Sequence, residues 1–354
     1  MREYGSEHPS IQLPDGYFEG LDRYGRELTY LRTGREALMY ASCNCKPGKE
    51  AAILCPAYCC WSMTAPFEFT GWTVVYYRLN EDLTIDEEYL EGLLRGGRPD
   101  AILTMNFYGS VDTRSAIAKV KAFNDRITVI EDFSHCTFCL DRIFNEQVDY
   151  YVTSIRKSIG VCDGALVLSK KPTNRHYIGT AAPDFGMLRL GAQRQKGRYV
   201  YSKSTDDKSL FLSELRQGEG MIDKLDGVHP ISEISKAMLA SVNGEEIAFA
   251  RRENIRHLWS LLNGKIKMIP GLDRSFDGAP FSLPILVENR DIVQKRLAQK
   301  GVYAPVLWPI DDKARSVCDV SAYVSDHMLS IPIDQRYNYD DIEDIASIVL
   351  EICY

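Results

Sequence analysis

Short apolar runs rich in β-branched and aromatic residues alternate with longer amphipathic stretches through the first half of the chain. The short runs predict strands, and the recurrence of apolar residues every three or four positions predicts helices. Strands are expected at Ala51–Leu54, Thr73–Leu79, Ala101–Asn106, Ile127–Glu131, Tyr150–Ser154 and Ala165–Leu168. Helices are expected at Thr33–Ser42, Cys59–Phe69, Ile85–Leu94 and Arg114–Asn124. This alternation predicts an α/β fold with a mainly parallel sheet between two layers of helices.

The second half of the chain has a different pattern. Residues 172–228 form a charged, Gly-rich stretch that interrupts the alternation, and we expect an excursion over the surface. A solvated face is the favoured interpretation of its basic residues, with anion binding as the alternative. These are Arg189, Arg194, Lys196, Arg198, Lys203 and Lys208.

One or two helices are expected from Ile231 to about Asn263, followed by a compact α+β pattern. Strands are predicted at Phe281–Val287, Val302–Leu307 and Met328–Ile333, and helices at Asp291–Lys300 and Tyr339–Cys353. We therefore expect an N-terminal arm and large domain over residues 1–235. A linking helix and a small C-terminal α+β domain follow over residues 236–354.

Composition and charge restrict the class of protein. The 354 residues are 45% hydrophobic and 26% charged, as in an ordinary globular protein. The formal charge of -7 argues against nucleic acid and anionic membranes as general partners. No apolar run is long enough for a membrane span and no signal peptide is recognisable, so a cytoplasmic protein is expected.

Ten cysteines in a chain of this kind are expected to be reduced thiols, and no metal site is predicted. The spacing of some of them is also compatible with a zinc or iron–sulfur site, but nothing places these thiols near one another. The residues concerned are Cys43, Cys45, Cys59, Cys60, Cys136 and Cys139, with His135 beside them.

Two strand ends carry the candidate chemistry. One predicted strand is followed by Lys157 and a short Gly-containing loop, and another runs into Asp132 and, three residues later, His135. A lysine can form an imine with pyridoxal 5'-phosphate (PLP), and a carboxylate can keep the pyridine nitrogen of that cofactor protonated. The alternatives are a surface lysine, a turn aspartate and a half-buried histidine.

Phosphate donors for such a cofactor can also be sought in the sequence. Gly34, Arg35 and Glu36 begin a predicted helix, where free backbone N–H groups favour an anion. Ser154 and Arg156, just ahead of the lysine, are further candidate phosphate ligands. A glycine before a helix is also a common start signal, so this motif is weak by itself.

Taken in chain order, seven segments resemble the DegT/DnrJ/StrS family of PLP-dependent sugar aminotransferases, which have the aspartate aminotransferase fold (fold type I). They are Thr33–Leu38, Leu54–Tyr58 ahead of Gly71, Asn106–Gly109, Ile130–His135, Ser154–Lys157 with Asp163 and Gly164, Arg252–Asn254 and Leu329–Ile333. The resemblance spans nearly the whole chain and implies a sheet of the seven-stranded type.

The resemblance implies a homodimer in which Lys157 forms the Schiff base and Asp132 meets the pyridine nitrogen. An amino acid such as glutamate would supply an amino group to a keto-sugar, commonly nucleotide-linked. Cys60 falls where the family usually stacks an aromatic ring on the cofactor, with Tyr58 or Trp61 as substitutes. Tyr108, Tyr303 and Trp308 are candidate walls of a substrate pocket.

Two other functions are compatible with the same residues. A PLP-dependent dehydratase or lyase would use the same carbanion but would eject a neighbouring group. A non-catalytic dimeric scaffold or sensor would keep the fold without the chemistry, and the cysteine at the stacking position favours it. The presence of both Lys157 and Asp132 favours an enzyme.

Overall fold

The computed structural model describes residues 16–353, so the start of the predicted N-terminal arm, residues 1–15, lies outside the described residues. Seven strands form one sheet in the order β1-β7-β6-β5-β4-β2-β3. They are β1 Glu27–Leu31, β2 Ala51–Pro56, β3 Trp72–Tyr77, β4 Ala101–Met105, β5 Thr128–Asp132, β6 Tyr150–Thr153 and β7 Ala165–Ser169. Strands β2 to β5 pair in parallel, whereas β7 runs antiparallel to both β1 and β6. The predicted α/β class with a mainly parallel sheet is confirmed.

The chain divides into two compact units. The first contains described residues 47–149 and 245–353, with strands β2 to β5. Its helices are α2 Trp61–Phe69, α3 Glu87–Gly97, α4 Arg114–Phe123, α5 Leu140–Ile143, α9 Gly244–Leu262, α10 Arg290–Gln299, α11 Asp312–Val317, α12 Asp319–His327 and α13 Tyr339–Cys353, with short 3-10 turns at η2 Phe107–Gly109 and η5 Leu272–Asp277. Every residue of β4 is buried, which explains its unbroken apolar run.

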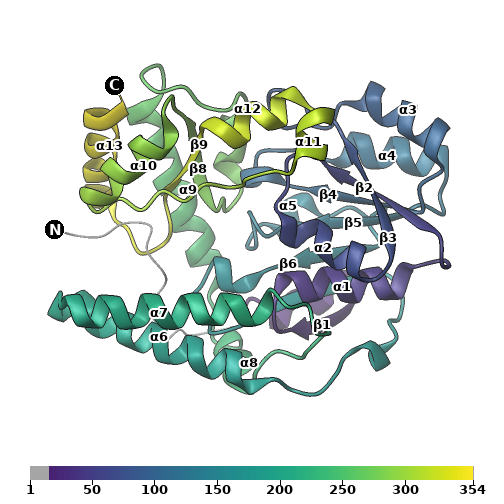
Figure 1. The fold of residues 1–354 in the computed structure, drawn as a ribbon, viewed down its shortest axis with the longest axis horizontal. Coiled ribbons are helices and arrows are strands. Elements are labelled where there is room, and N and C mark those ends of the chain that lie inside the picture. The colour runs from purple at the N-terminus through teal and green to yellow at the C-terminus, as the bar shows by residue number, and fades with distance from the viewer. Residues whose placement is uncertain (1–15, 354) are drawn as a thin grey trace. The chain divides into compact units, whose positions relative to one another are not determined.

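The same unit contains the antiparallel pair β8 Ser282–Leu286 and β9 Met328–Pro332. Helices α10 and α13 lie side by side next to this pair (Figure 1). Five apolar side chains of α13 are buried, at the spacing of one helix face: Ile342, Ile345, Ala346, Val349 and Ile352. The predicted strands at both ends of this region and its two predicted helices are therefore confirmed.

The second unit contains described residues 16–46 and 150–244, with strands β1, β6 and β7. Its helices are α1 Gly34–Cys45, α6 Pro183–Ser202, α7 Thr205–Ile222 and α8 Glu233–Leu239, with 3-10 turns at η1 Glu19–Tyr24, η3 Ile155–Lys157 and η4 Arg175–Tyr177. Helices α6 and α7 form a long antiparallel hairpin (Figure 1). Ser204 caps α7 by accepting a hydrogen bond from the Asp207 N–H.

Two expectations are corrected by this arrangement, and one strand was missed. Residues 172–228 contain the hairpin α6–α7 rather than an irregular excursion. The predicted strand Val302–Leu307 is absent from the described fold because Pro305 cannot donate to a ladder. The Val302 N–H bonds back to the Leu297 carbonyl, and the Pro305 carbonyl accepts one bond from the Ser330 N–H of β9. Strand β1 was not predicted, because it begins with a charged residue and has no continuous apolar run.

The division into domains at residue 235 stays a prediction. No helix in the described part of the chain combines the length and the apolar character that a membrane crossing needs. All ten cysteines are free thiols.

Candidate active site

Asp132 is the last residue of β5 and is 5% exposed. One of its carboxylate oxygens, Oδ1, accepts a hydrogen bond from the Ser134 N–H at 2.8 Å, and its carbonyl accepts one from the Asn106 N–H at 3.2 Å. The carboxylate therefore starts an Asx-type turn that leads the chain out of the strand. This turn brings the next polar residue, His135, into the same buried region.

His135 is 1% exposed and lies among aromatic rings. Its ring stacks on Phe281 with centroids 5.4 Å apart and on Trp308 at 5.2 Å, and it meets Tyr108 at 4.8 Å. The Tyr108 N–H donates to His135 Nδ1 at 3.4 Å, so a neutral ring carries its hydrogen on Nε2. An imidazole held in this way can donate a hydrogen bond to an oxygen atom of a ligand.

The loop that holds this histidine is conformationally unusual. Tyr108 and Gly109 have φ values of 54° and 69°, so two consecutive residues adopt the left-handed region. A bulky residue rarely adopts this conformation, and such strain collects at binding and catalytic sites. Tyr108 is fully buried, so packing of its ring holds the turn in place.

The three residues predicted around the stacking position separate in the structure. Tyr58 is fully buried and packs on Trp308 with centroids 5.5 Å apart, and its hydroxyl lies 3.4 Å from that of Tyr108. Burial raises the pKa of the Tyr58 hydroxyl well above its ordinary value, so the hydroxyl stays protonated. Cys60 instead forms a hydrogen bond between its Sγ and the Ser62 Oγ, 2.9 Å apart, and the side chain of Trp61 is exposed. Of the three, only Tyr58 joins the rings that pack around His135. We call these rings the aromatic cluster: Tyr58, Phe107, Tyr108, Phe281 and Trp308.

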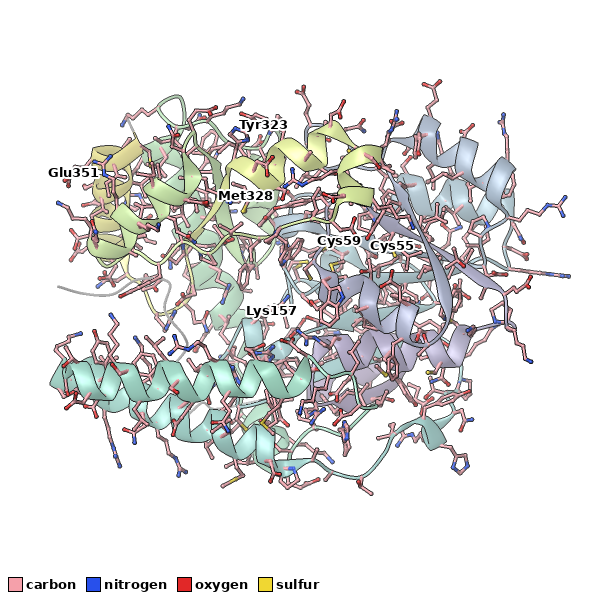
Figure 2. All side chains as sticks on the ribbon, in the orientation of Figure 1. Cys55, Cys59, Lys157, Tyr323, Met328 and Glu351 are labelled. Atoms are coloured by element: carbon pink, nitrogen blue, oxygen red, sulfur yellow. The ribbon has the colours of Figure 1, made fainter. Side chains whose placement is uncertain are left out.

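Lys157 ends the 3-10 turn that follows β6 and is half-buried (Figure 2). Within the described chain its amino group makes no hydrogen bond or ion pair, unlike the arginine beside it. The turn is closed by bonds from the Lys157 N–H to the Ser154 carbonyl and from the Ile155 N–H to the Gly164 carbonyl, at 3.4 and 3.0 Å. The amine is therefore available to a ligand.

Helix α1 begins against the segment that precedes this lysine. A Cβ atom at Gly34 would lie 2.9 Å from Ser154 Cβ, closer than real side chains approach. Thr33 caps the helix by accepting from the Glu36 N–H, and its hydroxyl donates to Glu36 Oε2 at 3.2 Å. The first N–H group of the helix, on Gly34, has no acceptor among the described residues. Only glycine permits this contact, and it leaves a donor for an anion at the helix end.

The fold can be compared with that of solved proteins. A DegT DnrJ EryC1 StrS aminotransferase from Brucella abortus superposes with a TM-score of 0.65 at 16% identity, covering 94% of this chain and 87% of that one. The fold is that of the DegT/DnrJ/EryC1/StrS aminotransferases. Helicobacter pylori PseC, an aminotransferase involved in the biosynthesis of pseudoaminic acid, gives a TM-score of 0.66 at 14% identity and covers 99% of both chains.

A third structure with this aminotransferase fold is Spr1654 from Streptococcus pneumoniae in its PMP form. Its TM-score is 0.70 at 12% identity, covering 99% of this chain and 97% of that one. No protein-family model and no curated protein matches the sequence. At sequence identities this low, the structural similarity establishes the fold alone. The fold predicted from the resemblance is confirmed.

Within this aminotransferase fold, the arginine next to the candidate lysine is engaged by an acid that the sequence did not reveal. Glu219 on α7 accepts from Arg156 Nη1 and Nη2 at 2.7 and 3.1 Å, and from Arg189 Nη1 at 3.0 Å. Arg35 forms a second ion pair with Asp223, 2.5 Å away. Arg189 is 2% exposed, so the prediction of a solvated face is wrong for it, and also for Lys196, which packs on Tyr199 and Phe211. The other four basic residues, Arg194, Arg198, Lys203 and Lys208, are exposed or half-buried.

Glu219→Gln is expected to lower the free energy of unfolding by about 2 kcal/mol, because Arg189 would lose its carboxylate partner inside the protein. Burial alone would raise the pKa of Glu219, but Arg156, Arg189 and Arg35 outweigh it and lower the pKa. The stabilisation is therefore complete above the ordinary pKa and is lost as the pH falls through the lowered value.

Urea denaturation of wild type and variant at neutral and acidic pH measures this effect. Glu253→Gln is the matched control, because Glu253 pairs with one exposed arginine, Arg256, and should change stability by less than ~0.5 kcal/mol. Equal effects of the two substitutions would contradict the importance of the buried pair.

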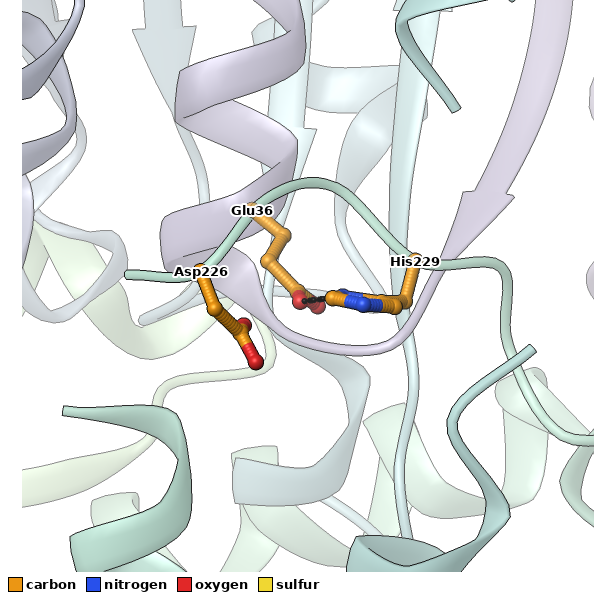
Figure 3. A group of neighbouring side chains, drawn as sticks. All are labelled: Glu36, Asp226 and His229. Atoms are coloured by element: carbon orange, nitrogen blue, oxygen red, sulfur yellow. Dashed lines mark hydrogen bonds and ion pairs between the residues drawn. The ribbon is translucent and has the colours of Figure 1, made fainter. Parts of the chain in front are cut away.

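A second cluster in the same unit combines Glu36, Asp226 and His229, whose possible ligand atoms all lie within 4.8 Å of one another (Figure 3). His229 Nδ1 lies 2.9 Å from Glu36 Oε1. Arg32 Nη2 pairs with both carboxylates, at 2.7 Å from Glu36 and 3.3 Å from Asp226. The guanidinium already supplies the positive charge that these acids require, so the cluster is explained without a metal ion.

Proposed function

We propose that the protein is a PLP-dependent aminotransferase that moves an amino group from an amino acid such as glutamate to a nucleotide-linked keto-sugar. The observation that carries the proposal is Lys157, a half-buried amine with no partner among the described residues, placed after β6 of an aminotransferase fold. Asp132 ends β5, and Lys157 follows β6. Ligands of open α/β sheets bind at the carboxyl ends of such strands.

The residues present fit the cofactor in four respects. Lys157 offers an amine for covalent attachment, and Asp132 offers a buried carboxylate for the pyridine nitrogen. His135, with its hydrogen on Nε2, can donate to the phenolic oxygen. The N-terminus of α1 and Ser154 offer donors for the phosphate. The PMP form of Spr1654 supports the same cofactor class for this fold.

When bound, the cofactor would supply an electron sink for the carbanion formed at the substrate carbon. Lys157 Nζ would take a proton from the substrate carbon as general base and would then deliver it to a carbon of the cofactor as general acid. Asp132 would keep the pyridine nitrogen protonated, and the aromatic cluster around His135 would exclude water from the ring. We further propose that the enzyme acts as a homodimer in the cytoplasm.

Absorption spectroscopy of the purified protein with and without glutamate tests the proposal. The protein is expected to show a visible band of attached cofactor, which glutamate should replace by the band of the amine form with release of one 2-oxoglutarate per site. A colourless protein that ignores added PLP would contradict cofactor binding. A stable band that glutamate leaves unchanged would contradict amino transfer from this donor.

The ion pairs of Arg35 and Arg156 support the non-catalytic scaffold as the second candidate. Arg156 was predicted to bind phosphate, and Arg35 was predicted to lie at the phosphate-binding helix N-terminus; the side chains of both are engaged by carboxylates, of Glu219 and Asp223. A scaffold would keep these ion pairs permanently and would not release 2-oxoglutarate. The same glutamate experiment therefore separates the two candidates.

A further inference from the structure

A cavity of about 320 Å³ with polar and apolar lining lies in the unit that contains β4 and β5. It is bordered by the loop that follows β4 and by α5. Its volume is within the range of small-molecule pockets. The aromatic cluster uses the side chains of Phe107 and Tyr108 from this loop, whereas the cavity is lined by Asn106 and by residues from Gly109 onwards. The two sites therefore use different side chains of one loop.

Asn106 is the first feature that indicates a ligand. Its side chain is 4% exposed and lines the cavity, and its Oδ1 has no hydrogen-bond partner among the described residues. A buried amide oxygen without a donor destabilises the protein, and a hydroxyl or amino group of a ligand would remove that cost by donating to it.

Arg142 on α5 is the second feature. Its side chain is 51% exposed, and its closest carboxylate oxygen, on Asp277, is 4.0 Å away. The guanidinium makes no hydrogen bond with the described residues, so its fork is available to a ligand. By contrast, Arg114, which also lines the cavity, bonds to both oxygens of Asp112. A planar guanidinium binds carboxylates in a bidentate manner.

The remaining lining restricts the ligand. Two acids, Asp112 and Asp277, balance the two arginines, so a dianion gains little and a single carboxylate beside an amino or hydroxyl group is favoured. Val111 and Ile143 add apolar surface next to these polar groups. A short aliphatic side chain would cover that surface.

We propose that this cavity binds a small 2-amino or 2-hydroxy acid with an aliphatic side chain. Its carboxylate contacts the Arg142 guanidinium, and the amino or hydroxyl group donates to Asn106 Oδ1. The site needs neither Lys157 nor a cofactor, so it goes beyond the proposed aminotransferase function and is independent of it.

Calorimetric titration with L-leucine and with its 2-hydroxy analogue tests the proposal, because the hydroxy acid cannot form an imine. At least one of the two is expected to bind saturably to wild type and to Lys157→Ala with equal affinity. Arg142→Gln should weaken binding by ~10-fold or more, since it removes a charge-assisted pair. Arg126→Gln, which changes an exposed arginine outside the cavity, is the matched control and should bind like wild type.

Asn106→Leu provides a second variant, in which the donor of the ligand loses its acceptor and binding should also weaken. Circular dichroism confirms that each variant is folded before titration. Absence of saturable binding by both acids overturns the proposal. So does binding that survives Arg142→Gln but is lost in Lys157→Ala, which would place the ligand at the proposed cofactor site. A colourless protein that binds the hydroxy acid would contradict the aminotransferase and support the cavity.

Discussion

Lys157→Ala is expected to abolish the visible band of attached cofactor and to reduce amino transfer by more than ~10⁴-fold. The substitution removes the only side chain that we propose for covalent attachment and for proton transfer, and each of these roles contributes a large factor. Absorption spectra and single-turnover release of 2-oxoglutarate from glutamate measure the two effects separately.

Two further variants serve as controls for this result. Lys157→Arg keeps the positive charge without an amine that can form an imine, so it should lose the band as completely as the alanine variant. Lys236→Ala removes an exposed lysine of α8 and should leave both signals unchanged. A band that persists in Lys157→Ala and disappears in another lysine variant would assign the attachment point elsewhere.

Glu131→Gln is expected to raise the free energy of unfolding at pH 8 by about 3 kcal/mol relative to wild type. Glu131 is fully buried next to Asp132, accepts one bond from the Thr113 hydroxyl at 2.6 Å, and its Oε2 has no partner among the described residues. Burial raises its pKa from the ordinary value of 4.5 to about 7, and the charges of Asp112 and Asp132 add to this. Each pKa step corresponds to about 1.4 kcal/mol.

The sign of the pH dependence follows from proton binding. Between pH 4.5 and about 7 the native state keeps a proton that the unfolded state has lost, so wild-type stability falls as the pH rises through this window. Glutamine resembles the protonated acid and does not show this fall. Urea denaturation should therefore show a small difference in the free energy of unfolding between wild type and Glu131→Gln at pH 5, and the full difference of about 3 kcal/mol at pH 8. Glu81→Gln changes an exposed glutamate and is the control, which should unfold with the free energy of wild type at both pH values. A difference between wild type and Glu131→Gln that is the same at both pH values would contradict the raised pKa.

Much of the fold was predictable because most elements have a clear period and are flanked by turns or caps. Helices α6 and α7 were missed because their glycines weaken the helical pattern. The structure shows why one of these glycines is there: a Cβ at Gly218 would lie 3.3 Å from Arg189 Cγ and 3.6 Å from the ring of Phe185. The close approach of the two helices favours glycine, and local propensity does not reveal it.

The candidate site was predictable only in part. Lys157 and Asp132 follow apolar strands, which is a local signal in the sequence. The partners of their neighbours are not local: Phe281 stacks on His135 from far along the chain, and Glu219 binds Arg156 from a helix that was not predicted. Periodicity describes one element at a time, so contacts between distant elements could not be read from it.

The contact between Gly34 and Ser154 has a consequence for the evolution of this chain. The helix end that we propose to bind a phosphate and the turn that carries Lys157 touch through atoms close to the backbone, with no room for an intervening side chain. This close packing sets the spacing between the two points. We therefore expect related chains to differ in the substrate they accept while keeping the distance between the α1 N-terminus and Lys157, which a bound cofactor would have to span.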